Sequence, residues 1–323
     1  MSRASSAAGL FRERTQALLR RLKRQRPLRA GSLLITILGD AIVPRGGVIA
    51  LRSLIDLARP FGLTERLVRT AIGRLANEGW VVAQRNGRSS YYSLTANGKA
   101  RFAEATQRIY GAAPKSWSGE WTLVIVPPSI KQERESLRNE LTWLGFGQLT
   151  SGVFVHPTHG EEVIRARLAE LGSGGGLIVV QRGIVSPASA VQLVEMGWDL
   201  GELAERYRRF IDLFQPVDEA LPGACDPEAG EQAFMLRTLL VHEYRRIHLR
   251  DPQLPASLLP PDWAGSSAHA LCRELYSKVF AASERHLDAQ ARALTGALPR
   301  PSREVFSRFG GLPRVESAGE RRG

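Results

Sequence analysis

The first third of the chain repeats apolar residues at a helical spacing, and Pro and Gly interrupt the pattern. A helix is predicted over residues 28–39 (LRAGSLLITILG), and Pro44–Gly47 breaks the chain before a second helical pattern over Val48–Arg59. Pro60–Gly62 ends that second helix. A third helix is predicted over Thr64–Asn77, with the hydroxyl of Thr64 placed to cap its N-terminus.

The third predicted helix has two chemically different faces. One stripe is apolar and is expected to be buried: Leu67, Val68, Ala71, Ile72 and Leu75. The opposite stripe is polar and consists of Glu65, Arg66, Arg69, Thr70, Gly73 and Arg74. Guanidinium groups bond guanine bidentately and also neutralise phosphates, so this stripe is suited to DNA. A solvated helix face has a similar composition, so the stripe indicates DNA binding only together with the elements that flank it.

A predicted β-hairpin follows the third helix. Two short strands are expected within Trp80–Leu94, because Asn86-Gly87 favours the left-handed conformations of a tight two-residue turn. Arginines flank this turn, and Thr95–Tyr110 returns to helical spacing. Three helices followed by a hairpin with basic residues at its tip are typical of a winged helix-turn-helix domain. The predicted DNA contacts are Thr64, Arg66, Arg69, Thr70 and Arg74 on the helix, and Arg85, Arg88 and Ser89 on the wing.

The middle of the chain predicts strands and helices in the order βαββαβ. The expected elements are a strand at Trp121–Val126, a helix at Lys131–Trp143, strands at Gly147–Thr150 and Gly152–Val155, a helix at Glu161–Leu171 and a strand at Leu177–Gln181. This order is that of a ferredoxin-like split βαβ domain. Such domains act as ligand sensors, dimerisation modules, RNA binders and nucleases, so the fold alone does not define the function.

The remainder of the chain predicts helices. They are expected at Ala188–Met196, Leu200–Phe214, Glu231–Leu249 and Ala268–Leu294, and a Pro-, Gly-, Ser- and Arg-rich tail begins near Leu298. The predicted organisation is an α+β multidomain protein. It has a basic disordered arm at 1–27, a winged helix-turn-helix domain at 28–112, a ferredoxin-like domain at 118–186, a helical domain at 187–297 and a disordered tail at 298–323.

Charge is distributed unevenly along the chain. The 323 residues include 44 Lys+Arg and 32 Asp+Glu, for a net charge of +12. Residues 1–112 contain 20 of the basic and 6 of the acidic residues, a net charge of +14, so the remainder is close to neutral. A basic module joined to a near-neutral one predicts that the first part meets a polyanion.

Composition and motifs exclude several classes of protein. No apolar run reaches the roughly 20 residues that cross a bilayer, and no signal-peptide core is visible in the first 30 residues, so a cytoplasmic protein is expected. Cys225 and Cys272 are too few for a disulfide framework or a zinc site. His156 and His159 lie three apart on a loop without a clear third ligand, and they are expected to cap a turn rather than bind a metal.

No catalytic motif is present in the sequence. The ferredoxin-like segment is similar to the fold of Cas2-type nucleases, which place an aspartate at the end of the first strand, whereas this chain has Val126-Pro-Pro128 there. An RNA-binding or Cas2-like nuclease protein is the main alternative to a DNA-binding regulator. An acyl-CoA sensor without DNA binding, or an acyl-transfer enzyme, ranks below it.

Long ordered motifs resemble those of the PaaX-type repressors of phenylacetate catabolism. They are LLITILGDAIVPRGG (Leu33–Gly47), PFGLTERLVRTAIGRLANEGW (Pro60–Trp80), WTLVIVPP (Trp121–Pro128), LTWLGFGQLTSGVFVHP (Leu141–Pro157) and LVHEYRRIHLRDPQLPASLLPPDWAG (Leu240–Gly265). The resemblance covers about residues 28–290. It implies a non-enzymatic homodimeric repressor that binds a palindromic operator and is released by an aryl-acetyl-CoA, typically phenylacetyl-CoA.

An acyl-CoA effector is anionic with an aromatic end, so its pocket needs arginines beside apolar walls. The candidates are His242, Tyr244, Arg245 and Arg246 in one helical segment, Arg206 and Arg209 in another, and the indoles of Trp198 and Trp263. The first segment has an alternative role, because it could dock the C-terminal domain onto the middle one. Each tryptophan could equally belong to the core.

Overall fold

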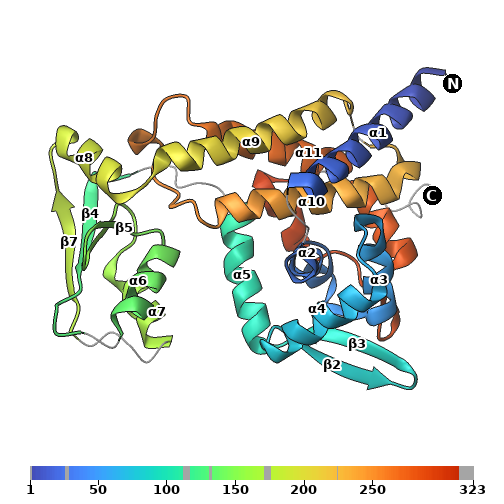
Figure 1. Cartoon of the computed structure of the whole chain (residues 1–323), viewed down its shortest axis with the longest axis horizontal. Helices are drawn as coiled ribbons and strands as arrows, with labels where there is room; N and C mark the ends of the chain where they lie inside the picture. Colours follow the sequence, from blue (N-terminus) through green and yellow to red (C-terminus); the bar gives the residue numbers. More distant parts are fainter. Residues whose placement is uncertain are drawn as a thin grey trace. The chain divides into compact units, whose positions relative to one another are not determined.

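A helix that runs through three hydrogen-bonding patterns begins the winged helix-turn-helix region (Figure 1). In this computed structural model, which describes residues 2–25, 29–111, 117–130, 133–170, 176–223 and 225–312, α2 (Ala30–Ile37) continues as a π-helical turn at Leu38–Ile42 and a 3-10 turn at Val43–Arg45. Pro44 lacks the backbone N–H that a longer helix would use, and Gly46 adopts a φ of 90°, so the chain reverses there. The helix thus extends beyond the predicted end at residue 39.

Residues 48–50 are a strand, and the prediction of a helix from Val48 is wrong at this end. Strand β1 (Val48–Ala50) pairs antiparallel with β3 (Ser89–Leu94), so that Val48 lies opposite Ser93. The hairpin of β2 (Val81–Asn86) and β3 leaves one side of β3 free, and pairing with it overrides the helical pattern. The sheet order is β1-β3-β2. The helices of this region are α3 (Leu51–Ala58), a 3-10 turn at Arg59–Phe61, α4 (Glu65–Asn77) and α5 (Ala96–Tyr110).

The middle segment forms a four-stranded antiparallel sheet with helices on its faces. Its elements are β4 (Glu120–Ile125), α6 (Arg134–Trp143), β5 (Gly147–Thr150), β6 (Val153–His156), α7 (Glu161–Glu170) and β7 (Ile178–Ile184). The strand order β5-β6-β4-β7 confirms the predicted βαββαβ arrangement. One core packs Val124 and Phe154 of the sheet against Leu137 and Ile164, while α8 (Pro187–Gly197) adds to a second core around Trp121.

The last part of the chain is helical, as predicted. It contains α9 (Leu200–Glu219), α10 (Gly230–His248) and α11 (Ala264–Gln290), with 3-10 turns at Pro227–Ala229 and Ala256–Leu258, two-residue strands β8 (Arg292–Ala293) and β9 (Gly296–Ala297), and a 3-10 segment at Arg303–Gly310. Among the described residues, no helix is long and apolar enough to cross a membrane.

Contacts divide the chain into two compact units. The terminal unit contains Met1–Gly111, Arg209–Arg246 and Ser267–Gly323, and the middle unit contains Ala112–Arg208 and Ile247–Ser266. The helical region is therefore shared, because α10 and most of α11 pack with the winged helix. The domain boundaries predicted from the sequence, at 28–112, 118–186 and 187–297, therefore stay predictions.

The described residues of the predicted arm and tail, 2–25 and 298–312, are ordered where disorder was predicted. Residues Ser2–Gln25 form α1, whose Phe11, Leu18, Leu19 and Leu22 are buried at a helical spacing that the surrounding charges obscure in the sequence. In the expected tail, Val305, Phe309 and Leu312 are buried. Apolar contacts therefore order these segments, and the predicted arm and tail are wrong up to residue 312. Residues 313–323 lie outside the described part of the chain.

A buried carboxylate holds the terminal unit together. Asp40, in the π-helical turn, accepts hydrogen bonds from Arg237 of α10 at 2.6 Å and from Arg308 near the C-terminus at 2.9 Å. The hydroxyls of Tyr110 and Tyr276 donate to the same carboxylate at 2.6 and 2.8 Å. All five side chains are buried, so each charge depends on its partners in the absence of water.

The network extends to a second carboxylate on α11. Arg237 also pairs with Glu284 at 2.5 Å, and Arg45, which follows the π-helical turn, pairs with Glu284 at 3.1 Å and with Asp288. Three acidic and three basic side chains are thereby paired between the winged helix and the segments that follow it. These contacts join positions that lie up to 268 residues apart in the sequence.

We predict that Asp40→Asn lowers the free energy of unfolding by about 3–5 kcal/mol, because Arg237 and Arg308 lose a charged partner without gaining water. Urea denaturation followed by circular dichroism measures this free energy of unfolding. Asp56→Asn is the control, since Asp56 pairs only with exposed arginines and should cost under about 1 kcal/mol. Equal losses in the two variants would contradict the importance of the buried cluster.

Asp40 also predicts a pH dependence. Burial by itself raises the pKa of Asp40, but Arg237 and Arg308 outweigh it, and the pKa lies below its ordinary value. A depressed folded-state pKa stabilises the protein above the unfolded-state pKa, and this stabilisation is lost as pH falls through the folded-state value. Stability measured between neutral pH and about pH 3 should therefore fall less steeply in Asp40→Asn than in the wild type. Parallel plots of unfolding free energy against pH for the two proteins would contradict this role of Asp40.

Candidate DNA-binding surface and effector residues

The recognition helix α4 presents a basic face to solvent. Thr64 caps it as predicted, its Oγ1 accepting a hydrogen bond from the backbone N–H of Leu67 at 3.3 Å. Val68, Ala71, Ile72 and Leu75 are buried, as predicted. Leu67 is 44% exposed, which corrects its place in the buried stripe. The residues exposed with Leu67 include Glu65, Arg66, Arg69, Thr70 and Arg74.

Two arginines of this face are paired in weak surface ion pairs. Arg69 lies 2.7 Å from Glu65, and Arg74 lies 3.2 Å from Glu78. Both guanidiniums are more than half exposed, so solvent screens these pairs and each contributes little to stability. The pairs can therefore exchange for DNA contacts at small cost.

Helix α2 supports α4 from behind. Leu33, Leu34 and Ile37 of α2 are buried, and a Cβ added to Gly31 would lie 3.3 Å from the Nη2 of Arg74. Glycine at the start of α2 therefore leaves space for an arginine of the recognition helix. Any shift of α2 is expected to move the basic face of α4.

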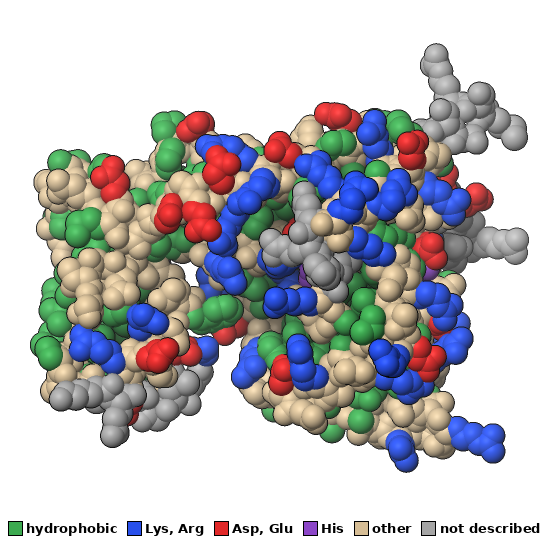
Figure 2. Space-filling model, in the orientation of Figure 1, with side chains coloured by type: hydrophobic (Ala, Val, Ile, Leu, Met, Phe, Trp, Pro, Cys, Tyr) green, Lys and Arg blue, Asp and Glu red, His purple; other side chains and the backbone are tan. Residues whose placement is uncertain are grey.

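The wing carries its basic residues at an exposed tip. Asn86 pairs with Ser89, so the two turn residues are Gly87 and Arg88, one position later than predicted. Only Gly87 of the predicted Asn-Gly pair has a positive φ, at 59°. Arg85, Arg88 and Ser89 are exposed. Figure 2 shows Lys and Arg side chains over the region of α4 and at the end of this hairpin.

Two of the predicted effector residues on α10, His242 and Tyr244, are buried, and Arg245 is partly buried. His242 is 2% exposed and its Nδ1 lies 3.0 Å from the Oγ1 of Thr36 on α2. Arg245 donates to that same Oγ1 and to the carbonyl and hydroxyl oxygens of Ser32, each at 2.8 Å. Burial lowers the pKa of Arg245. Tyr244 is fully buried and its hydroxyl contacts Nδ1 of His269.

These contacts give the α10 segment a scaffold role that differs from the predicted one. His242 and Arg245 hold α2 of the winged helix, whereas the alternative weighed for this segment was docking of the C-terminal domain onto the middle one. Ser32 and Thr36, which receive them, were missed in the sequence. Two hydroxyl residues one turn apart on an otherwise apolar helix were the available signal.

The other arginine candidates have local acidic partners or stay exposed. Arg246 pairs with Glu243 at 3.3 Å, and Arg206 pairs with Glu202 at 2.5 Å. Arg209 is exposed. Arg206, Trp198 and Trp263 belong to the middle unit, and the other five candidates belong to the terminal unit. The eight residues therefore do not meet within either unit.

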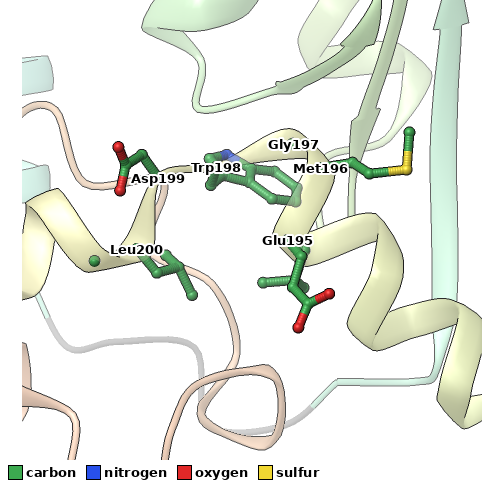
Figure 3. Close-up of a pocket in the computed structure, with 8 residues that line it drawn as sticks. Glu195, Met196, Gly197, Trp198, Asp199 and Leu200 are labelled. Carbon is green, nitrogen blue, oxygen red and sulfur yellow. The ribbon is translucent and has the colours of Figure 1, made fainter.

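Trp198 lines a pocket of about 500 Å³ in the middle unit (Figure 3). Its Nε1 donates to the carbonyl of Gly145 at 2.9 Å, and Glu195 and Asp199 are the ionisable residues of the lining. Two carboxylates suit a cation or a neutral group better than CoA phosphates. Trp263 is 8% exposed and packs edge-on against Tyr207, so it is a core residue.

The two loop histidines cap a turn, as predicted. Nδ1 of His156 accepts hydrogen bonds from the backbone N–H groups of Thr158 at 3.1 Å and His159 at 3.0 Å. The two rings stack with centroids 4.1 Å apart. In the described ranges, no group of three or more His, Cys, Asp or Glu side chains is arranged to hold a metal ion.

The order of elements and the exposed basic helix define a winged helix-turn-helix protein with a ferredoxin-like module. Family models match along its length: PaaX-like protein at residues 29–98, PaaX protein central Cas2-like domain at 114–193 and PaaX-like protein C-terminal domain at 198–289. The chain belongs to the PaaX-like family.

One relative and one solved structure are similar to the chain. The transcriptional repressor PaaX of Escherichia coli is 36% identical over 289 residues, covering 88% of this chain and 92% of the relative. An uncharacterized protein from Mycobacterium tuberculosis is 26% identical with a TM-score of 0.46, covering 74% of this chain and 89% of that structure.

We predict that Arg245→Met destabilises the terminal unit by about 1.5–3 kcal/mol, because it removes a partly buried guanidinium and leaves Ser32 and Thr36 with fewer partners. Arg246→Met, next along α10 and 32% exposed, is the matched control and should change stability by less than about 0.5 kcal/mol. Chemical denaturation compares the two. Equal stability of both variants would show that Arg245 does not hold α2.

Proposed function

We propose that this protein is a transcriptional repressor that binds a palindromic operator as a homodimer. The exposed, arginine-bearing face of α4 beside a basic wing is the observation that carries this proposal. Arg66, Arg69, Thr70 and Arg74 are suited to the major groove, where Arg reads guanine and neutralises phosphate. Arg85, Arg88 and Ser89 would contact the flanking backbone, and Thr64 would orient the N-terminus of α4.

A dimer follows from the amount of sequence that one winged helix can read. A single module contacts too few base pairs to select one site in a genome, and a second copy doubles the sequence read. In such a dimer the two recognition helices lie roughly 34 Å apart, in successive major grooves. The similarity to a curated repressor over 88% of the chain supports this function over a nuclease or RNA binder, and a repressor works in the cytoplasm with the DNA.

The regulated genes are proposed to be those of an aromatic-acid pathway, phenylacetate catabolism. An aryl-acetyl-CoA such as phenylacetyl-CoA would release the operator because it binds more tightly to a conformation of the protein that has low affinity for DNA. Arg206, Arg209 and Arg246 are suited to its phosphates because each is partly or fully exposed. His242 and Arg245 contact α2 and would act through it, and Tyr244, whose hydroxyl contacts His269, would support them. About 1–3 kcal/mol of coupling loosens an operator roughly 5–150-fold.

We predict that Arg69→Ala weakens operator binding by about 1–3 kcal/mol if it reads a base, or weakens all duplexes alike if it touches phosphate. Fluorescence anisotropy on operator and random duplexes distinguishes the two. Arg208→Ala is the control, because Arg208 is as exposed as Arg69 and is paired with Glu205 in a similar surface pair. Unchanged affinity of Arg69→Ala for both duplexes would remove Arg69 from the interface.

We predict that phenylacetyl-CoA, but not free phenylacetate, dissociates the operator complex. The thioester supplies the phosphates that the exposed arginines can bind, and the free acid lacks them. A mobility-shift titration measures the release. Release by the free acid, or by no aryl-acetyl-CoA, would contradict the proposed effector while leaving the DNA-binding function intact.

A further inference from the structure

Helix α1 carries a second basic surface that the proposed function does not use. Its apolar side is buried through Phe11, Leu18, Leu19 and Leu22, so the opposite side is held in a fixed position. That side exposes arginines and a lysine near the C-terminal end: Arg20, Arg21, Lys23 and Arg24. The family models begin at residue 29, so α1 lies outside the matched segments.

The basic end of α1 lies beside the start of the recognition helix. A Cβ built on Gly62 would lie only 2.5 Å from Nζ of Lys23, which places that ammonium against the turn before α4. Gly62 precedes Thr64, the N-cap of α4, by two positions. Arg21 secures the same end of α1 by donating to the carbonyl of Asp212 at 3.4 Å. The cationic end is therefore fixed next to the proposed DNA-reading surface.

The charge of this end is not neutralised within the protein. In the part of the chain that the structure describes, no carboxylate lies within 4.0 Å of Arg20, Arg21, Lys23 or Arg24. Arg69 and Arg74 on α4, in contrast, each have a glutamate partner. On the face shown in Figure 2, Lys and Arg side chains gather both over α1 and over the region of α4. An uncompensated row of cations beside a DNA-binding helix attracts phosphates.

We propose that Arg20, Lys23 and Arg24 of α1 bind the phosphate backbone of the DNA that α4 reads, next to the N-terminus of α4. This inference rests on the proposed function. The wing follows the C-terminal end of α4, so α1 contacts the duplex at the opposite end of the recognition helix. Phosphate contacts carry no base information, and α1 therefore adds affinity for every duplex and fixes the register of α4.

One variant removes two charges from the basic end of α1, and the control removes two from the middle of the same helix. Lys23→Gln with Arg24→Gln is the test variant, and Arg12→Gln with Arg14→Gln is the matched control, because Arg12 and Arg14 are exposed on the same helix about 16 Å away. Glutamine keeps helix propensity close to that of lysine and arginine. Binding of the full-length protein is measured over a range of salt concentrations, on a duplex that the wild type selects from a random pool and on an unselected duplex of equal length.

The test variant should bind both duplexes roughly tenfold more weakly at about 0.1 M salt, and its plot of log affinity against log salt should be shallower by roughly 1.8. The control should keep the wild-type slope. The variant Lys23→Arg with Arg24→Lys retains both charges and should also keep the wild-type slope. Its comparison with the test variant separates a phosphate contact from a structural effect. An unchanged slope in the test variant, or an equal loss in the control, would overturn the proposal. A wild-type protein that selects no duplex would instead contradict the proposed function itself.

Discussion

The terminal unit depends on the burial of the Asp40 carboxylate. A charge removed from water is stable only with charged or hydrogen-bonding partners, and Asp40 obtains them from α5, α10, α11 and the segment near the C-terminus. These segments must therefore come together before the Asp40 carboxylate in the π-helical turn has its hydrogen-bond partners. Arg308, which contributes one of the bonds, lies in the segment that its composition suggested would be disordered. A single buried carboxylate thus ties the chain's helical end to the start of its winged helix.

The same arrangement links the helical region to the surface that reads DNA. His242 and Arg245 of α10 hold Thr36 and Ser32 on α2, and α2 packs behind α4. A ligand that shifts α10 would therefore shift α2 and with it the basic face of α4. This route uses buried polar contacts with discrete partners, which is how a small displacement becomes a change between two arrangements. The middle unit has its own sheet and cores and contains Arg206, whereas Arg209 and Arg246 belong to the terminal unit.

The periodic parts of the fold could be predicted from the sequence, and the parts decided by tertiary contacts could not. Helix α4, its Thr64 cap and the order βαββαβ follow from local spacing. Strand β1 was assigned to a helix because its partner β3 lies more than 40 positions away, and the burial of Leu18 and Leu22 in α1 was hidden by the surrounding arginines. Among the candidate site residues, the arginines of α4 are exposed, as the polar stripe predicted, and their contact with DNA stays a prediction. The contacts of Arg245 with α2 could not be foreseen, because its partners Ser32 and Thr36 are about 210 residues away in the sequence.

Selection from a pool of random duplexes tests the central claim most directly, since it asks whether the full-length protein reads DNA sequence without assuming an operator. The protein should enrich an inverted repeat whose half-sites are centred about one helical turn, roughly 10 base pairs, or a multiple of it apart. Enrichment of no sequence, with equal affinity for the starting and final pools, would contradict a sequence-specific repressor.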